Sequence, residues 1–148
     1  MKIASSPVYL DASALAKVYL PERDSDVLDA ALNGRRDLIV SDLAITEVTS
    51  AMARRVREGQ LPRREATTVY RAMVRDVVEG QFRHVELTAG THREAERLLL
   101  AASDGMGLRA GDALHLAAAV LAGARTLVTF DQRMAAAACA IGTFDVPI

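Results

Sequence analysis

The chain has 148 residues, 51% hydrophobic and 25% charged, with a net charge of −1 at pH 7. This is ordinary for a soluble globular protein, so we expect one domain over residues 1–148. The near-neutral charge excludes a molecule that is basic overall, and the longest apolar runs are too short to cross a bilayer. The N-terminus lacks the apolar region of a signal peptide, so we expect a cytoplasmic protein that does not enter a membrane.

Short runs rich in Val, Ile and Leu alternate with helical patterns along the chain. Up to the middle of the sequence we expect a strand at 7–10, helices at 13–20 and 25–32, a strand at 37–40, a helix capped by Ser41 or Asp42 and ending at 57, and a helix at 63–78. Beyond it we expect a strand at 84–87, helices at 91–102 and 110–121, a strand at 126–129, a helix at 131–138 and a last strand at 143–146. Thr91 is expected to cap its helix, with Glu94 at the capping-box position.

This alternation predicts an α/β fold with three layers, in which helices cover both faces of a mainly parallel sheet of about four to five strands. Right-handed crossovers place the carboxyl ends of all parallel strands along one edge. Ligands of open parallel sheets bind outside that edge. Polar side chains that follow the strands are therefore the first candidates for a functional site.

Two aspartates are expected at that edge. Asp11 follows the apolar run VYL, and Asp131 follows LVTF. An aspartate between a strand and a helix is also a favoured N-cap, so capping alone would explain either residue. Their significance depends on whether other acidic side chains join them.

Two further acids interrupt apolar helical segments. Asp112 and His115 are the only polar side chains in AGDALHLAAAVLA, a pattern typical of a buried helix. Asp112 as the N-cap is an open alternative, and we interpret His115 as a core histidine with satisfied hydrogen bonds. Glu47 is the only charged residue in LAITEVTSAM, although a solvated glutamate is common in helices.

If these carboxylates converge, they need a proton or a cation. Two carboxylates about 4 Å apart repel by roughly 4 kcal/mol at an effective dielectric constant near 20. The three histidines are scattered and Cys139, which we interpret as a small core residue, is the only cysteine, so no zinc-type cluster is present in the sequence. An all-oxygen site indicates Mg²⁺, or alternatively Mn²⁺, and phosphoester chemistry.

The acidic residues lie in four segments that resemble motifs of PIN-domain ribonucleases, specifically the VapC toxins of bacterial type II toxin–antitoxin pairs. The segments, in order, are YLDASALAKVYLPE with Asp11 and Ser13, TEV with Glu47, LRAGDALHLAAA with Asp112, and LVTFD with Thr129 and Asp131. The resemblance covers nearly the whole chain. Two positions depart from the family pattern: Met134 stands where an aromatic residue is frequent, and Phe130 where a polar one is.

The resemblance implies a PIN-like fold and a Mg²⁺-dependent endoribonuclease. It implies that Asp11 and Asp112 ligate the metal directly, and that Asp131 supports it through water. Glu47 would be a ligand or the base that accepts the proton of the attacking water. Ser13 and Thr129 would hydrogen-bond to the carboxylates or to metal-bound water. The implied partners are an RNA substrate, a cognate antitoxin and a second copy in a homodimer.

Other functions fit the sequence less well. The main alternative is a PIN-like module that binds RNA or protein without cleavage, but a scaffold has no need for a repulsive acidic cluster. A phosphatase that forms an acyl phosphate would carry a second aspartate where Ser13 stands. A phosphorylated receiver domain would have an acidic pair near the end of the first strand and a lysine after a later strand, and this chain has neither. The sequence leaves open which RNA is cleaved.

The stretch from Arg54 to Arg75 is rich in arginine. Arg64, Arg71 and Arg75 follow one another at spacings that place them on one stripe of a helix. A solvated face is the simpler interpretation of this stripe, and a rail for RNA phosphates is the alternative.

Overall fold

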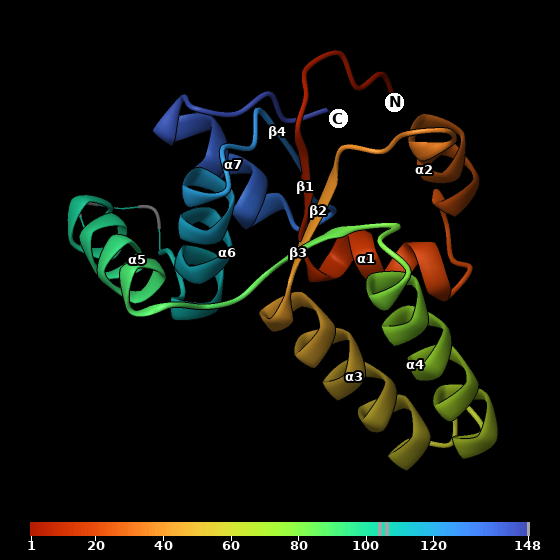
Figure 1. The fold of residues 1–148 in the computed structure, drawn as a ribbon. Coiled ribbons are helices and arrows are strands. Elements are labelled where there is room, and N and C mark those ends of the chain that lie inside the picture. The colour runs from red at the N-terminus through yellow and green to blue at the C-terminus, as the bar shows by residue number, and fades with distance from the viewer. Residues whose placement is uncertain (104, 106, 148) are drawn as a thin grey trace.

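The computed structural model describes residues 1–103, 105 and 107–147 (Figure 1). The four strands are β1 (Val8–Leu10), β2 (Leu38–Ser41), β3 (Arg83–Val85) and β4 (Thr126–Val128). The helices are α1 (Ala12–Tyr19), α2 (Ser25–Leu32), α3 (Asp42–Arg57), α4 (Arg63–Val78), α5 (Ala89–Ala101), α6 (Ala110–Leu121) and α7 (Gln132–Ile141). The strands form one sheet in the order β3-β2-β1-β4, with every neighbouring pair parallel. The predicted parallel α/β sheet is thus confirmed.

The two faces of the sheet carry separate hydrophobic cores, because successive side chains of a strand point to opposite faces. Tyr9, Ile39 and Leu127 pack with residues of α5, α6 and α7 on one face. Val8, Leu10 and other strand residues pack with α1 to α4 on the opposite face. Figure 1 shows α5, α6 and α7 on one side of the strands, while α3 and α4 project below the sheet as an antiparallel pair. The three-layer expectation is therefore correct.

The predicted last strand at 143–146 is wrong, since the chain makes only an isolated bridge between Thr126 and Asp145 there. Asp145 uses both backbone groups, accepting from Leu127 N–H and donating to Arg125 C=O. Pro147 follows, and it has no N–H with which to extend a ladder. In the described part of the chain the sheet therefore stays at four strands.

Several predicted bounds differ from the observed ones by one or two residues, and α7 continues to Ile141 rather than ending at residue 138. Two of the differences have a hydrogen-bonding cause. β3 ends at Val85 rather than at residue 87, because Leu87 N–H lies 3.3 Å from both carboxylate oxygens of Asp42 instead of joining the ladder. The cap of α5 is Thr88, not Thr91. Thr88 accepts from Thr91 N–H, and Thr91 Oγ1 accepts from Thr88 N–H, so two hydroxyls form the capping box assigned to Glu94.

Cys139 is exposed, so its interpretation as a small core residue is wrong. It lies on α7, whose buried residues are Met134, Ala137 and Ala138. The alanine-rich run hides this, because alanine fits the buried and the exposed face of a helix equally well. No helix within the described residues has the length and apolar character that crossing a membrane requires.

Candidate functional site

The carboxyl ends of β1 and β4 place Asp11 and Asp131 on neighbouring strands. Leu10 pairs with Val128 in the parallel register, and the chain leaves both strands immediately afterwards. Asp11 is the N-cap of α1, where it accepts from Ala14 N–H at 2.9 Å. Asp131 is the N-cap of α7, where it accepts from the N–H groups of Arg133 and Met134. The capping role considered for each aspartate is thus present.

Asp11 is almost completely buried, and hydroxyl groups hold both of its oxygens. Its side chain and backbone together expose 4% of their surface. Ser13 Oγ donates to Asp11 Oδ1 at 2.7 Å, and Thr129 Oγ1 donates to Oδ2 at 2.5 Å. These are the hydrogen bonds to carboxylates that were expected of Ser13 and Thr129.

Thr129 and Ser13 also bind the loop that leads to Asp131. Asp131 N–H donates to Thr129 Oγ1 at 3.1 Å, and Phe130 N–H donates to Ser13 Oγ at 2.8 Å. The β4–α7 loop is therefore tied to the start of α1 by the same hydroxyls that hold Asp11. Unlike Asp11, Asp131 is exposed, so it is open to water and to ligands.

Glu47 is held by a chain of buried polar groups that sequence reasoning did not identify. His115 Nε2 donates to Glu47 Oε2 at 2.7 Å, and His115 Nδ1 lies 2.9 Å from the Tyr9 hydroxyl. Tyr9 in turn donates to Ser41 Oγ at 2.8 Å. His115 is indeed a buried histidine with both ring nitrogens satisfied, as interpreted. What was missed is that one partner is the predicted catalytic Glu47, whose side chain remains 40% exposed.

Asp112 lies in the first turn of α6 but is not its N-cap, so that alternative is wrong. Arg109 takes the N-cap position, and Asp112 Oδ2 accepts from Arg109 N–H at 3.2 Å. The preceding Gly111 faces Glu47: a Cβ atom added there would lie 3.2 Å from Glu47 Oε1. The first turn of α6 and the carboxylate of Glu47 are therefore in contact range.

The electrostatics of this edge favour a cation at Asp11. Burial raises the pKa of Asp11 above its ordinary value, while hydrogen bonds from Thr129, Ala14 and Ser13 act in the opposite direction. The charge of His115 also lowers the pKa of Asp11, by less than these hydrogen bonds do. A desolvated carboxylate held by neutral donors suits a hard divalent ion, which binds oxygen ligands.

The four predicted acids do not form a ready ligand set. Among residues 1–103, 105 and 107–147, no three acidic, histidine or cysteine side chains are arranged to hold one metal ion. Asp11 and Asp131 are linked through Thr129, and Glu47 meets the first turn of α6. Convergence of all four on one metal stays a prediction.

The two departures from the expected motifs have structural roles. Met134 exposes only 1% of its surface and belongs to the core beneath α7. The Phe130 ring lies beneath Lys17, whose Nζ is 4.8 Å from the ring centroid, a cation–π distance.

Comparison with known proteins identifies the family. Residues 8–139 match the PIN domain family. The chain belongs to the PIN domain family. This PIN domain is 34% identical over 137 residues to Ribonuclease VapC45 and to Ribonuclease VapC49, both of Mycobacterium tuberculosis, with 91% of each chain covered.

Solved structures share the fold of this PIN domain. FitAcB from Neisseria gonorrhoeae gives a TM-score of 0.72 at 17% identity, covering 94% of this chain and 95% of that one. VapC20 of M. tuberculosis, a toxin that cleaves the sarcin–ricin loop, gives 0.68 at 19% identity, covering 88% and 94%. VapBC2 from Rickettsia felis, bound to promoter DNA, gives 0.64 at 13%, covering 95% and 96%. At these identities the likeness concerns the fold alone.

Proposed function

We propose that this protein is an endoribonuclease toxin of a toxin–antitoxin pair, which hydrolyses RNA phosphodiesters with the help of a divalent cation, Mg²⁺ in the first place and Mn²⁺ as the alternative. The 34% identity to two VapC ribonucleases over 91% of the chain supports the reaction class. The observation that carries the chemistry is the buried Asp11 carboxylate, gripped by Ser13 and Thr129 at the open edge of the sheet. Burying an unpaired charge is unfavourable, and a bound cation would offset that unfavourable free energy.

Each predicted residue has a distinct task in this proposal. Asp11 and Asp112 would hold the cation, with Asp131 supporting it through water. When bound, the cation would supply positive charge against the charge that develops on the phosphodiester. Glu47 is exposed enough to meet a water molecule, and His115 fixes its orientation. Glu47 would therefore accept the proton of the attacking water, or join the ligand set.

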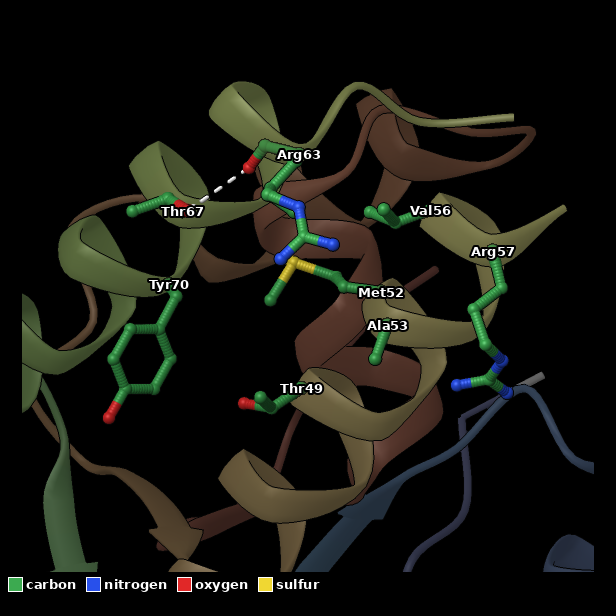
Figure 2. A pocket seen from close by; sticks show the side chains of 9 residues that line it. Thr49, Met52, Ala53, Val56, Arg57, Arg63, Thr67 and Tyr70 are labelled. Atoms are coloured by element: carbon green, nitrogen blue, oxygen red, sulfur yellow. Dashed lines mark hydrogen bonds between the residues drawn. The ribbon is translucent and has the colours of Figure 1, made fainter. Parts of the chain in front are cut away.

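The proposed partners are a cognate antitoxin and a second copy of the chain. The structural likeness to FitAcB and VapBC2 supports an antitoxin partner here. A groove of about 360 Å³ between α3 and α4 offers a docking place (Figure 2). Met52, Ala53, Val56 and Ala66 line it, and the 42% exposed ring of Tyr70 lies at its side. An amphipathic segment of the antitoxin would place its apolar side chains there and its acidic ones against Arg63.

Cleavage by the purified chain tests the function. We expect RNA to be cut when Mg²⁺ is present, cutting to stop in EDTA, and added Mg²⁺ or Mn²⁺ to restore it. Asp11→Asn should lower the cleavage rate by at least about 100-fold, because it removes a ligand charge. The matched control is Asp26→Asn, an exposed aspartate of α2 whose loss should leave the rate unchanged.

If the protein is instead a non-catalytic binding module, the opposite results are expected. Such a module would bind RNA or its partner equally well with and without Asp11, and would release no cleavage products. Equal cleavage by Asp11→Asn and wild type, both purified under identical conditions, would instead exclude the proposed metal chemistry.

A further inference from the structure

A polar concavity of about 250 Å³ lies on α3 beside Glu47. Glu47, Ser50, Ala51, Arg54 and Arg57 line it. These residues recur every three or four positions, so they occupy one face of the helix. A predicted catalytic carboxylate and two guanidinium groups therefore share one open surface.

We propose that Arg54 and Arg57 form a phosphate-binding subsite that holds the RNA backbone next to the bond being cleaved. The inference rests on the proposed ribonuclease function and on the position of Glu47 in the same concavity. An α-helix rises 1.5 Å per residue, so the backbone of Arg54 lies about 10 Å along the axis from Glu47, and that of Arg57 about 15 Å. Both long side chains are within reach of phosphates that follow the cleaved one along a single strand.

The charge state of the neighbours supports this role. Arg55, between them in sequence, forms an ion pair with Glu22. Arg54 and Arg57 are exposed and make no ion pair with any residue that the structure describes. Glu47 is bonded to His115 through Oε2, which leaves it directed at α6 rather than neutralised by Arg54. The arginines thus keep their charge available on an acidic edge that would otherwise repel RNA.

The shape of the concavity fits a backbone ligand. Ser50 and Ala51 are small, so they leave space between the carboxylate and the guanidinium groups. Guanidinium forks pair bidentately with phosphate oxygens. Figure 2 shows that the Arg57 side chain extends away from Tyr70, across the groove between α3 and α4. Arg57 also lines that groove, so the subsite and the groove proposed for the antitoxin adjoin at this residue, while Arg54 lines only the concavity.

Salt-dependent RNA binding tests the subsite. The probe is a fluorescent single-stranded RNA of random sequence, bound in Mg²⁺ to protein carrying Asp11→Asn so that it is not cut. Arg54→Ala with Arg57→Ala should weaken binding at least about tenfold and lower the slope of log K against log salt by about 1.4, since each phosphate contact on a single strand contributes about 0.7. The control pair Arg36→Ala with Arg125→Ala removes the same charge from exposed positions that precede β2 and β4, at the opposite edge of the sheet, and its slope should change by less than half as much.

Cleavage kinetics and a conservative pair complete the test. In the otherwise wild-type chain, the Arg54 and Arg57 alanine pair should raise KM while kcat stays within about threefold, as expected for lost binding that ground and transition states share. Replacing both by lysine should restore most of the slope because the charges return. Unchanged thermal unfolding would show that the fold is intact.

Three outcomes overturn the subsite. Affinity and slope equal to those of the control pair would show that the two arginines contact no phosphate. Normal RNA binding with lost inhibition by the antitoxin would assign them to an acidic protein segment. If the wild type cleaves RNA but the Arg54 and Arg57 alanine pair binds RNA like the control pair, only the subsite proposal is wrong. If the wild type neither cleaves nor binds RNA, the proposed ribonuclease function is wrong as well.

Discussion

Asp11 combines two tasks at the end of β1. It caps α1 through Ala14 N–H, and it presents a buried carboxylate that Ser13 and Thr129 hold in place. An asparagine would serve the cap equally well, so the cap does not require a charge at this position. The charge is therefore the part of Asp11 that only function explains.

Removing that charge should stabilise the metal-free protein. Burial raises the native pKa of Asp11, so the native state binds this proton more tightly than the unfolded state does. Stability of the wild type should then decline as the pH rises from the ordinary aspartate pKa through the raised native one. Asp11→Asn cannot titrate, so its advantage in melting temperature should grow over the same interval. Thermal unfolding in EDTA between about pH 4 and about pH 8 measures this.

The control for that measurement is Asp131→Asn. Asp131 is exposed and an asparagine can keep its capping bonds, so its melting temperature should follow the wild type. An Asp11→Asn protein that is less stable than wild type at about pH 8 would contradict the argument that burial of the charge is costly.

At the scale of the element, the first turn of α6 shapes the surroundings of Glu47. Gly111 is helical, so its lack of a side chain is not needed for its backbone conformation. The glycine leaves room for the Glu47 carboxylate, since an added Cβ would lie 3.2 Å from Glu47 Oε1. The Glu47 side chain is restricted in moving away from such a Cβ, because His115 is hydrogen-bonded to its other carboxylate oxygen.

Gly111→Ala should therefore separate activity from stability. Alanine favours a helix over glycine by up to about 1 kcal/mol, so the free energy of unfolding should stay level or rise by up to that amount. RNA cleavage should fall severalfold because the carboxylate is displaced. Urea unfolding and cleavage assays measure the two effects, with Ala110→Gly as a helix control that lies one residue earlier. Full activity in Gly111→Ala would show that Glu47 tolerates displacement.

At the scale of the whole molecule, the α3–α4 pair forms a projection that the sheet does not cover. Figure 1 shows both helices extending below the strands, and the groove of Figure 2 runs between them. Tyr70 lies along this groove and is 42% exposed. An exposed aromatic ring beside an apolar groove is a common anchor of protein interfaces.

Tyr70→Ala should accordingly weaken antitoxin binding about tenfold, or about 1.4 kcal/mol, by removing the anchor. RNA cleavage by the free toxin should not change, because Tyr70 lines the groove and makes none of the hydrogen bonds that hold Asp11. Titration of the cognate antitoxin against each variant provides the dissociation constants. Val78→Ala, an exposed apolar residue of the same helix outside the groove, should bind the antitoxin like the wild type. Equal affinities for all three proteins would exclude this docking place.

Local patterns were sufficient for most elements. The bounds of α2, α4 and α6 were predicted without error, because Pro62 marks the start of α4 while Gly34 and Gly123 follow the ends of α2 and α6. Predictions failed where another group competed with the expected one. Asp42 captures Leu87 N–H and shortens β3. Thr88 replaces Thr91 as the cap, since both threonines and the helix pattern fit either choice.

The sequence by itself determined the alternation of strands and helices, the parallel sheet and the four acidic positions, because periodicity and family motifs are local properties of the chain. Only the tertiary structure decided that Thr129 binds Asp11 and that His115 links Tyr9 to Glu47. These partners lie far apart in sequence, and parallel strand pairing together with the packing of α6 on the sheet brings them together. Hydrogen bonds depend on angles and distances that no spacing along a chain specifies.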